Sequence, residues 1–294
     1  MMLVESEQKV SVIVTYYNAM KYMERCCACL LGQTYRNLEI ILVNDGSTDG
    51  CEELCHQLTA GDSRVVHISK PNTGVSDSRN CGVNQATGEW LYFADADDLL
   101  VPDAIEELYT AAYKGGCSMA IAEFYRVRGN KYFSSNRGYG GVISKADFVR
   151  RMRLRPANIY YGSLWNKIFK RELFEKSGAS FNSKVAFGED HMLFLQLMSC
   201  VETIAVVDRP LYYYMDNDGS LMHQGIVNPI ALVKNKILLY KGYSQLYKQT
   251  GLDKRVSDKL KGLFVLVAFA TDAWVMPFHY DLDGEQARII RNGR

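Results

Sequence analysis

The chain has 294 residues, which is enough for one large domain with an appendage or for two domains. Its 34 basic and 33 acidic residues leave a formal charge of +1, so the overall charge gives no reason to expect non-specific binding to nucleic acid. With 48% hydrophobic and 23% charged residues, the composition excludes a disordered or fibrous protein.

The N-terminal residues and the cysteines indicate the compartment. Residues 1–9 are polar and lack the apolar core of a signal peptide, so we interpret the eight cysteines as reduced thiols. The longest apolar run, residues 263–278, contains Thr271 and Asp272 and is too short to span a bilayer comfortably. These observations predict a cytoplasmic protein.

Strands that alternate with helices are predicted over the first 125 residues. Apolar or β-branched runs of strand length occur at residues 10–15, 38–43, 65–68, 89–94 and 119–124, with helical spacing of apolar residues between several of them. Asn18 is expected to cap the first helix, Ser47 or Thr48 the second, and Pro102 to occupy the first position of a later one. This alternation predicts an α/β fold with a mainly parallel sheet flanked by helices.

Polar side chains follow three of these predicted strands. Thr15, Tyr17 and Asn18 come after the first strand, Asp45 after the second, and Asp95 and Asp97 after the fourth. Because the ligand crevice of a parallel sheet lies beyond the carboxyl ends of its strands, these clusters should converge on one edge. Two carboxylates on one face of a strand suit Mg²⁺ or Mn²⁺, and a solvated acidic turn is the alternative.

The pattern changes after about residue 125. Residues 129–141 are polar and rich in glycine, which is typical of a loop, and residues 144–153 read as a short basic helix. Glu189 and Asp190 open an amphipathic helix, and the chain from residue 229 onward is largely helical.

Five blocks of sequence resemble the family 2 glycosyltransferases of GT-A fold, the group that builds bacterial polysaccharides. They are residues 10–18 (VSVIVTYYN), 33–35 (QTY), 43–49 (VNDGSTD), 72–74 (NTG) through 78–82 (SRNCG), and 95–98 (DADD) with Pro102 and Asp103. The resemblance covers residues 9–125 strongly and continues more weakly through residues 165–167 and 188–190. It implies a GT-A domain over residues 1–225, with a Rossmann-like nucleotide-sugar half at about 9–125 and an acceptor half at about 126–225, followed by a helical extension over 226–294.

The resemblance also implies a binding site for a nucleotide sugar, most simply a UDP-sugar. It assigns to this donor Thr15, Tyr17, Asn18, Asp45, Arg79 and Asp95. Asp45 would accept a hydrogen bond from the uracil imide, and Arg79 would reach the diphosphate near a helix N-terminus. A turn-forming role for Asp45 and a surface position for Arg79 are the structural alternatives.

A divalent metal and a catalytic base complete the implied site. Asp97, assisted by Asp95, would hold Mn²⁺ or Mg²⁺, with His223 as a further ligand. Asp190 matches the family's base position, with Glu189 as second choice, and helix capping is the alternative for both. Trp165 would either face an acceptor sugar or pack in the core.

These assignments predict an inverting, metal-dependent transfer of one sugar to a growing surface glycan, with a lipid-linked glycan as the expected acceptor. Neither the Gln-x-x-Arg-Trp signature nor the membrane spans of processive synthases are found in the sequence, which favours a single addition. The alternative is a catalytically silent protein of the same fold that only binds nucleotide sugars. An NAD-type dehydrogenase is excluded because no Gly-x-Gly-x-x-Gly follows the first strand.

Contact with the inner face of the cell membrane is a separate expectation. Basic residues at 145–155, together with Lys167, Lys170 and Arg171, would attract anionic headgroups. The alternative is that these residues form an ordinary solvated face.

Overall fold

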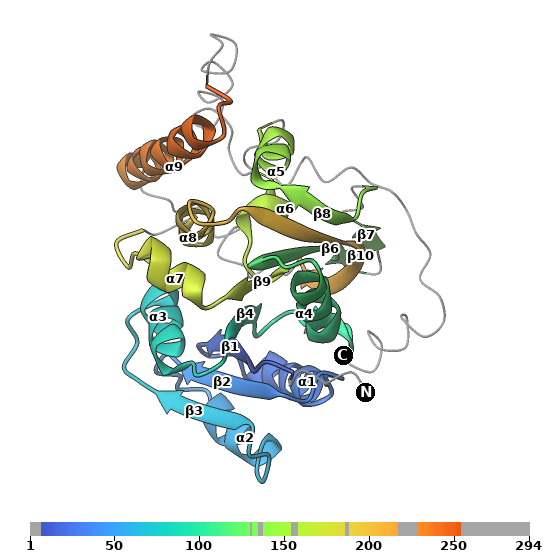
Figure 1. Ribbon diagram of the computed structural model, residues 1–294. Helices are drawn as coiled ribbons and strands as arrows, with labels where there is room; N and C mark the ends of the chain where they lie inside the picture. The colour runs from blue at the N-terminus through green and yellow to red at the C-terminus, as the bar shows by residue number, and fades with distance from the viewer. Residues whose placement is uncertain are drawn as a thin grey trace, which may run out of the picture.

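The structure is a computed structural model that describes residues 7–129, 131–134, 138–153, 158–185, 188–216 and 229–253. In this part of the chain a ten-stranded sheet has the order β3-β2-β1-β4-β9-β6-β10-β5, with β7 beside β6 and β8 beside β10 (Figure 1). The candidate metal ligand His223, and the boundary expected at residue 225, lie outside the described residues.

The strands are β1 (Val10–Tyr16), β2 (Leu38–Asn44), β3 (Val65–Ser69), β4 (Trp90–Asp95), β5 (Leu99–Leu100), β6 (Met119–Arg128), β7 (Lys131–Ser134), β8 (Gly141–Ser144), β9 (Lys167–Lys170) and β10 (Thr203–Met215). The helices are α1 (Met20–Leu31), α2 (Cys51–Leu58), α3 (Val75–Gln85), α4 (Ala104–Lys114), α5 (Lys145–Met152), α6 (Ile159–Gly162), α7 (Glu172–Ser177), α8 (Glu189–Leu197) and α9 (Pro229–Gln249).

The N-terminal half of the sheet is parallel, as the alternating pattern predicts. β1 lies between β2 and β4, and Thr15 pairs with Val43 on one side and with Asp95 on the other. The middle strands are buried on both faces, which explains their unbroken runs of β-branched residues. This register brings the carboxyl ends of three strands, with the polar residues that follow them, to one edge of the sheet.

The other half of the sheet is mixed. β9 is antiparallel to both β4 and β6, while the long strand β10 runs parallel to β6 and antiparallel to β5 and β8. The predicted α/β class and the mainly parallel first half are confirmed, and β9 is the strand that joins the two halves.

Helix α3 packs closely on β1. A Cβ atom at Gly82 would lie 2.5 Å from Cγ2 of Ile13, so only glycine fits at this contact. All eight cysteines are free thiols, and Cys26, Cys27, Cys51, Cys55 and Cys117 are buried. The interpretation of the cysteines as reduced thiols agrees with this packing.

The expected helix caps were wrong in detail. Asn18 has a positive φ of 49° and accepts a hydrogen bond from Thr48 N, while Asp49 accepts bonds from the first N–H of α1 (Met20) and the first of α2 (Cys51). One aspartate serves both helices because the parallel strands β1 and β2 end side by side. Likewise, α4 begins at Ala104, two residues after Pro102.

Helix α9 packs along α8 at one end of the molecule, away from the parallel strands (Figure 1). Among the helices that the structure describes, none is both long and apolar enough to cross a bilayer.

Candidate active site

The turn after β2 is built around the carboxylate of Asp45. Its Oδ1 accepts a hydrogen bond from Thr73 N (3.0 Å) and its Oδ2 from Gly74 N (2.9 Å), and the Lys70 ammonium also donates to it. Burial alone would raise the pKa of Asp45, but these bonds bring it below the ordinary value. Asp45 therefore carries a charge that shapes the loop before α3, and Lys70 is a partner that the sequence analysis missed.

Residues after β1 complete this side of the edge. The Tyr17 side chain is 52% exposed, and Thr15 lies level with Asp95 in the sheet. Gly46 has a φ of +75°, and a Cβ atom there would lie 2.8 Å from Asn72 N, so the turn and the loop touch through their backbones. The site therefore offers the exposed aromatic face of Tyr17 beside two closely packed loops.

Arg79, on α3, joins three carboxylates from two distant parts of the chain. Its Nη1 lies 2.5 Å from Asp190 Oδ1 and 3.1 Å from Glu189 Oε1, and its Nη2 lies 3.0 Å from Asp95 Oδ1. The Arg79 side chain is only 8% exposed, and the Phe181 ring lies 5.5 Å from its guanidinium carbon. One guanidinium group thus holds the end of β4 against the start of α8.

The surroundings of Asp190 raise the pKa of its carboxyl group. Burial raises the pKa of Asp190 to about 7, the Arg79 charge opposes this rise, and the charges of Glu189 and Asp95 add to it. A pKa close to the working pH is what general base catalysis requires. The carboxylate is also still reachable, since 21% of the side chain is exposed.

The turn after β4 concentrates negative charge. Asp98 is buried, and its Oδ1 accepts a hydrogen bond from Met215 N at 2.7 Å. Burial raises the pKa of Asp98 well above its ordinary value, and the charges of Asp97 and Asp95 raise it further. The Tyr212 hydroxyl accepts a bond from Asp95 N, and Arg25 donates to the Asp97 carbonyl. This turn is therefore held from β10 and α1, by residues that the sequence analysis had not singled out.

The described residues contain no group of three or more His, Cys, Asp or Glu side chains placed to hold a metal ion. What they offer is the pair Asp95 and Asp97 at the end of β4. These are hard oxygen donors, which fit Mg²⁺ or Mn²⁺ when the ion keeps waters and takes its other ligands from a diphosphate. A cation bound there would offset the charge of these two carboxylates.

A family model described as glycosyl transferase family 2 matches residues 11–178, more than half of the chain. The chain belongs to glycosyltransferase family 2. The matched range contains the strand ends and Arg79, whereas Glu189 and Asp190 lie just beyond it.

Bacterial glycosyltransferases are similar to this family 2 chain in sequence. The glycosyltransferase GlyA of Streptococcus pneumoniae is 30% identical to this chain. The match covers 73% of this chain and 32% of GlyA. EpsJ of Bacillus subtilis, an uncharacterized glycosyltransferase, is 29% identical over 72% of this chain, which spans 62% of EpsJ. The chain thus spans about a third of one relative and less than two thirds of the other.

Solved structures of S. aureus TarS have the same fold. The UDP complex of TarS superposes with a TM-score of 0.68 at 18% identity, covering 91% of this chain and 82% of that one. The UDP-GlcNAc complex gives a TM-score of 0.66 at 19% identity, covering 88% and 79%. At this identity the match shows the GT-A fold and carries nothing about residue roles.

Behind the candidate base of the glycosyltransferase domain lies a buried lysine. Lys167 has no exposed surface, and its Nζ donates to Tyr160 O (2.8 Å), Ser163 O (2.5 Å) and Asn166 Oδ1 (2.7 Å). Burial lowers the pKa of Lys167, yet three acceptors require the three N–H groups of an ammonium ion. Lys167 cannot contact a membrane surface, so including it among the headgroup-binding residues was wrong.

Trp165 packs in the core. The residue is 4% exposed, and its ring stacks on those of Tyr212 and Tyr214, with centroids 4.5 Å and 5.6 Å away. The Phe124 ring lies perpendicular to it, with centroids 4.8 Å apart. This is the packing alternative for Trp165, and a sugar would reach the ring only if these neighbours moved.

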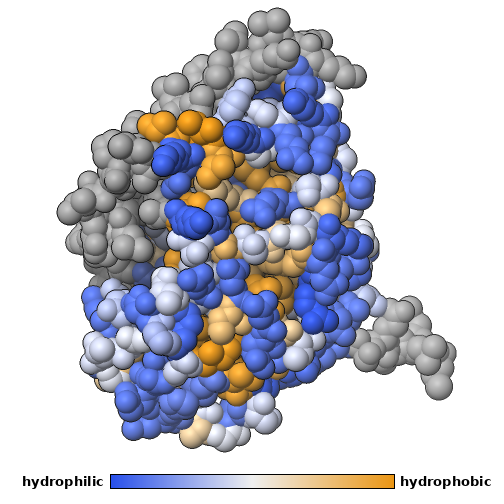
Figure 2. All heavy atoms as spheres, turned by 90° about the vertical axis from the view of Figure 1, so that its left-hand side faces the viewer, coloured by the Kyte–Doolittle hydropathy of each residue, from blue (hydrophilic) through white to orange (hydrophobic). Residues whose placement is uncertain are grey.

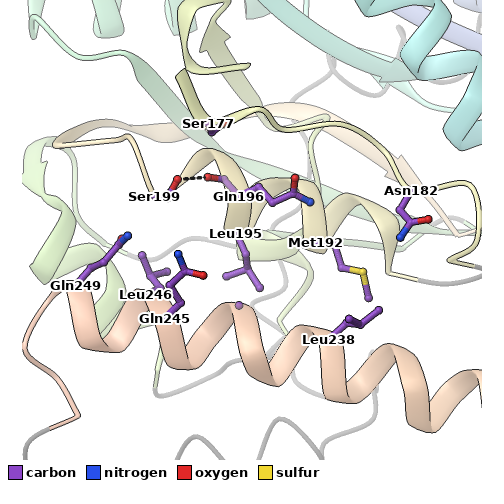
Figure 3. Close-up of a pocket in the computed structure, with 11 residues that line it drawn as sticks. Ser177, Asn182, Met192, Leu195, Gln196, Ser199, Leu238, Gln245, Leu246 and Gln249 are labelled. Atoms are coloured by element: carbon purple, nitrogen blue, oxygen red, sulfur yellow. Dashed lines mark hydrogen bonds between the residues drawn. The ribbon is translucent and has the colours of Figure 1, made fainter. Parts of the chain in front are cut away.

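A groove runs between α8 and α9, beginning one helical turn after Glu189 (Figure 3). It has a volume of about 380 Å³, and none of its 11 lining residues is charged. Amide side chains of Asn182, Gln196, Gln245 and Gln249 border it, with Leu and Met side chains between them. Such a surface offers donors, acceptors and apolar contacts without charge, which suits a neutral polar ligand.

Proposed function

We propose that this chain transfers one sugar from a UDP-sugar to an acceptor glycan, with inversion at the anomeric carbon and with the help of a divalent metal. The observation that carries this proposal is the Arg79 bridge, because it places the candidate base Asp190 and the strand-end carboxylate Asp95 on two sides of one guanidinium group. A donor held at the strand ends would then have its anomeric carbon near the base.

The donor site in this proposal is the edge formed by β1, β2 and β4. Tyr17 supplies the exposed aromatic face for the nucleobase, Thr15 and Asn18 border it, and Asp45 is the partner of the uracil imide. Because the Asp45 carboxylate already accepts bonds from the Lys70–Gly74 loop, the nucleobase would share or replace one of them. The UDP and UDP-GlcNAc complexes of TarS, which has the same fold, support a uridine donor.

The chemical step requires one base and a stabilised leaving group. Asp190 removes the proton from an acceptor hydroxyl, whose oxygen attacks the anomeric carbon from the face opposite the phosphate. A bond from carbon to the acceptor oxygen forms as the bond to the phosphate oxygen breaks, and UDP leaves with the electron pair. A bound Mn²⁺ or Mg²⁺ at Asp97 and Asp95 would neutralise charge on that diphosphate. Glu189 is the second candidate for the base.

In this proposal Arg79 both joins the three carboxylates and contacts the diphosphate of the donor. Without a donor its guanidinium is occupied by three carboxylates, so contact with the diphosphate would require it to exchange at least one of them. We propose that Asp95 is the partner released, because its side chain is the most exposed of the three at 31%. Arg79 would then keep Asp190 and Glu189 in place while it turns toward the phosphate.

The acceptor is proposed to be a neutral glycan, and the amide-lined groove is the candidate surface for it. On α8 the groove residues Met192 and Gln196 lie on the same helical face as Glu189, at spacings of three and seven residues. A saccharide lying along α8 would therefore lead to the carboxylates at the start of that helix.

The test is donor turnover measured with and without a metal chelator. UDP release from a panel of UDP-sugars should require Mn²⁺ or Mg²⁺ and should rise when a glycan acceptor is added. A protein that binds UDP-sugars in calorimetry, yet releases no UDP under any of these conditions, would instead be the catalytically silent alternative.

A further inference from the structure

Helix α9 presents an unusual solvent face. Exposed large aliphatic side chains are few in the described residues, and three of them, Val233 (56% exposed), Ile237 (43%) and Leu238 (44%), lie within six positions of this helix. Figure 2 shows apolar atoms gathered near the top of the face on which α9 lies in Figure 1. Val233 and Ile237 are four positions apart and therefore lie on the same face of the helix, whereas Leu238 borders the groove with α8.

The same face is basic. Lys234, Lys241 and Lys248 are exposed on α9, and the helix contains no aspartate or glutamate. The ammonium groups of these three lysines make no hydrogen bond or ion pair within the described chain. Since the whole chain has a formal charge of only +1, this is a local concentration of positive charge.

The basic segment singled out in the sequence is different, because its cations are engaged with the protein. Arg150 pairs with Asp147, Arg151 lies 3.7 Å from the centre of the Tyr139 ring, and Lys145 donates to Ser199 O at 3.1 Å. Arg155 lies outside the described residues. The lysine side chains of α9 thus differ from these three cations, which are all engaged with the protein.

We propose that the exposed face of α9, defined by Val233, Lys234, Ile237 and Lys241, binds an anionic lipid surface. A helix that combines exposed aliphatic side chains with lysines and no acidic residue has the composition of a helix that lies in the interface of a membrane. The lysine ammonium groups contact the headgroups, and the aliphatic side chains enter the boundary with the acyl chains. The opposite face of α9 remains packed on α8, where Tyr243 bonds His191.

This inference goes beyond the sugar transfer and does not depend on it. Helix α9 packs on α8, and α8 begins with Glu189 and Asp190. Because α9 forms one wall of the groove, a membrane bound by α9 would lie near the proposed acceptor groove, which would suit a lipid-linked acceptor.

Sedimentation of the full chain with vesicles tests the proposal. The wild-type protein should bind vesicles of phosphatidylcholine mixed with phosphatidylglycerol, should bind pure phosphatidylcholine far more weakly, and should be released by salt. In the Lys234→Gln/Lys241→Gln variant the partition coefficient should fall roughly thirtyfold, since each lysine near an anionic surface contributes about fivefold. Val233→Ser/Ile237→Ser should also weaken binding.

The matched control is Lys21→Gln/Lys114→Gln, which removes the same charge from exposed positions on α1 and α4. It should bind like the wild type, and all variants should keep the wild-type unfolding midpoint because the substituted side chains are exposed. The proposal would be overturned if the wild-type protein did not bind anionic vesicles. It would also be overturned if the control lost as much vesicle binding as the α9 lysine variant. Variants of α9 that leave lipid binding unchanged but alter the mass in solution would overturn it too, since a second copy would then cover this face.

Discussion

Arg79 and Asp190 lie 111 positions apart in the chain, yet Nη1 of one is 2.5 Å from Oδ1 of the other. The contact joins α3, which follows the loops of the proposed donor site, to α8, which carries the candidate base. Because Asp95 shares the same guanidinium group, a change at any of these residues should affect the others. The predictions below use this coupling.

Asp190→Asn should lower kcat by about 10²- to 10⁴-fold, because the amide cannot accept the acceptor's proton. UDP-sugar binding, measured by calorimetry, should change much less. The wild-type rate should rise with pH through about 7, the pKa to which burial raises Asp190, and level off above it. Glu189→Gln is the matched control: if it lost the same activity while Asp190→Asn kept it, Glu189 would be the base.

The stability of Asp190→Asn relative to the wild type should depend on pH. The pKa of Asp190 is about 7 in the folded chain and near 3.8 when unfolded, so between these values the folded state holds a proton that the unfolded state has lost. The free energy of unfolding of the wild type therefore falls as pH rises from about 4 to 7. The variant does not lose this stability, because asparagine does not titrate. Urea unfolding should show the variant gaining most at pH 8 and nothing near pH 4; an advantage equal at both values would contradict the assignment.

Arg79→Gln should destabilise the fold by about 2–4 kcal/mol at pH 8, since it leaves three partly buried carboxylates without their cation. Lower pH should reduce the loss, because protonated carboxyls need no counter-charge. Arg150→Gln breaks the pair with Asp147, whose two side chains are 56% and 50% exposed, and should cost less than about 1 kcal/mol. Equal losses in the two variants would show that the Arg79 bridge is worth no more than a surface pair.

Gly82→Ala should destabilise the domain by about 1–3 kcal/mol through overpacking, because the new methyl group would lie 2.5 Å from Ile13 Cγ2. Asn84→Ala, at an exposed position of the same helix, should leave stability unchanged or raise it slightly. Denaturant unfolding of both variants measures the difference. A neutral Gly82→Ala would mean that α3 can move away from β1.

Much of the fold was predictable from the chain. The runs at residues 10–15, 38–43 and 89–94 are buried on both faces of a parallel sheet, and a buried strand has a strong and local sequence signal. The antiparallel strand β9, only Lys167–Lys170, was not predicted, since four residues between loops carry little periodicity. The predicted helix caps were wrong because Asp49, in the loop after the neighbouring strand, accepts the hydrogen bond at the start of α1.

The candidate site was predictable only in part. The residues after β1, β2 and β4 converge because these strands run in the same direction, and the alternation of strands and helices in the sequence indicates that direction. The joining of Arg79 to Asp190 depends on how α8 packs against α3, and no local pattern encodes a contact of that range. The contacts of Lys70 and Lys167 were missed for the same reason, because sequence alone predicts a surface position for a lysine.

The most direct test of the proposed donor site compares UDP release by the wild type and Asp97→Asn over a Mn²⁺ titration, with UDP affinity measured in parallel. The wild type should require the metal for both turnover and tight UDP binding, while Asp97→Asn should lose at least about a hundredfold in turnover and gain little affinity from the metal. If Asp97→Asn kept full metal-dependent transfer, the assignment of the β4 carboxylates to the donor's diphosphate and metal would be wrong.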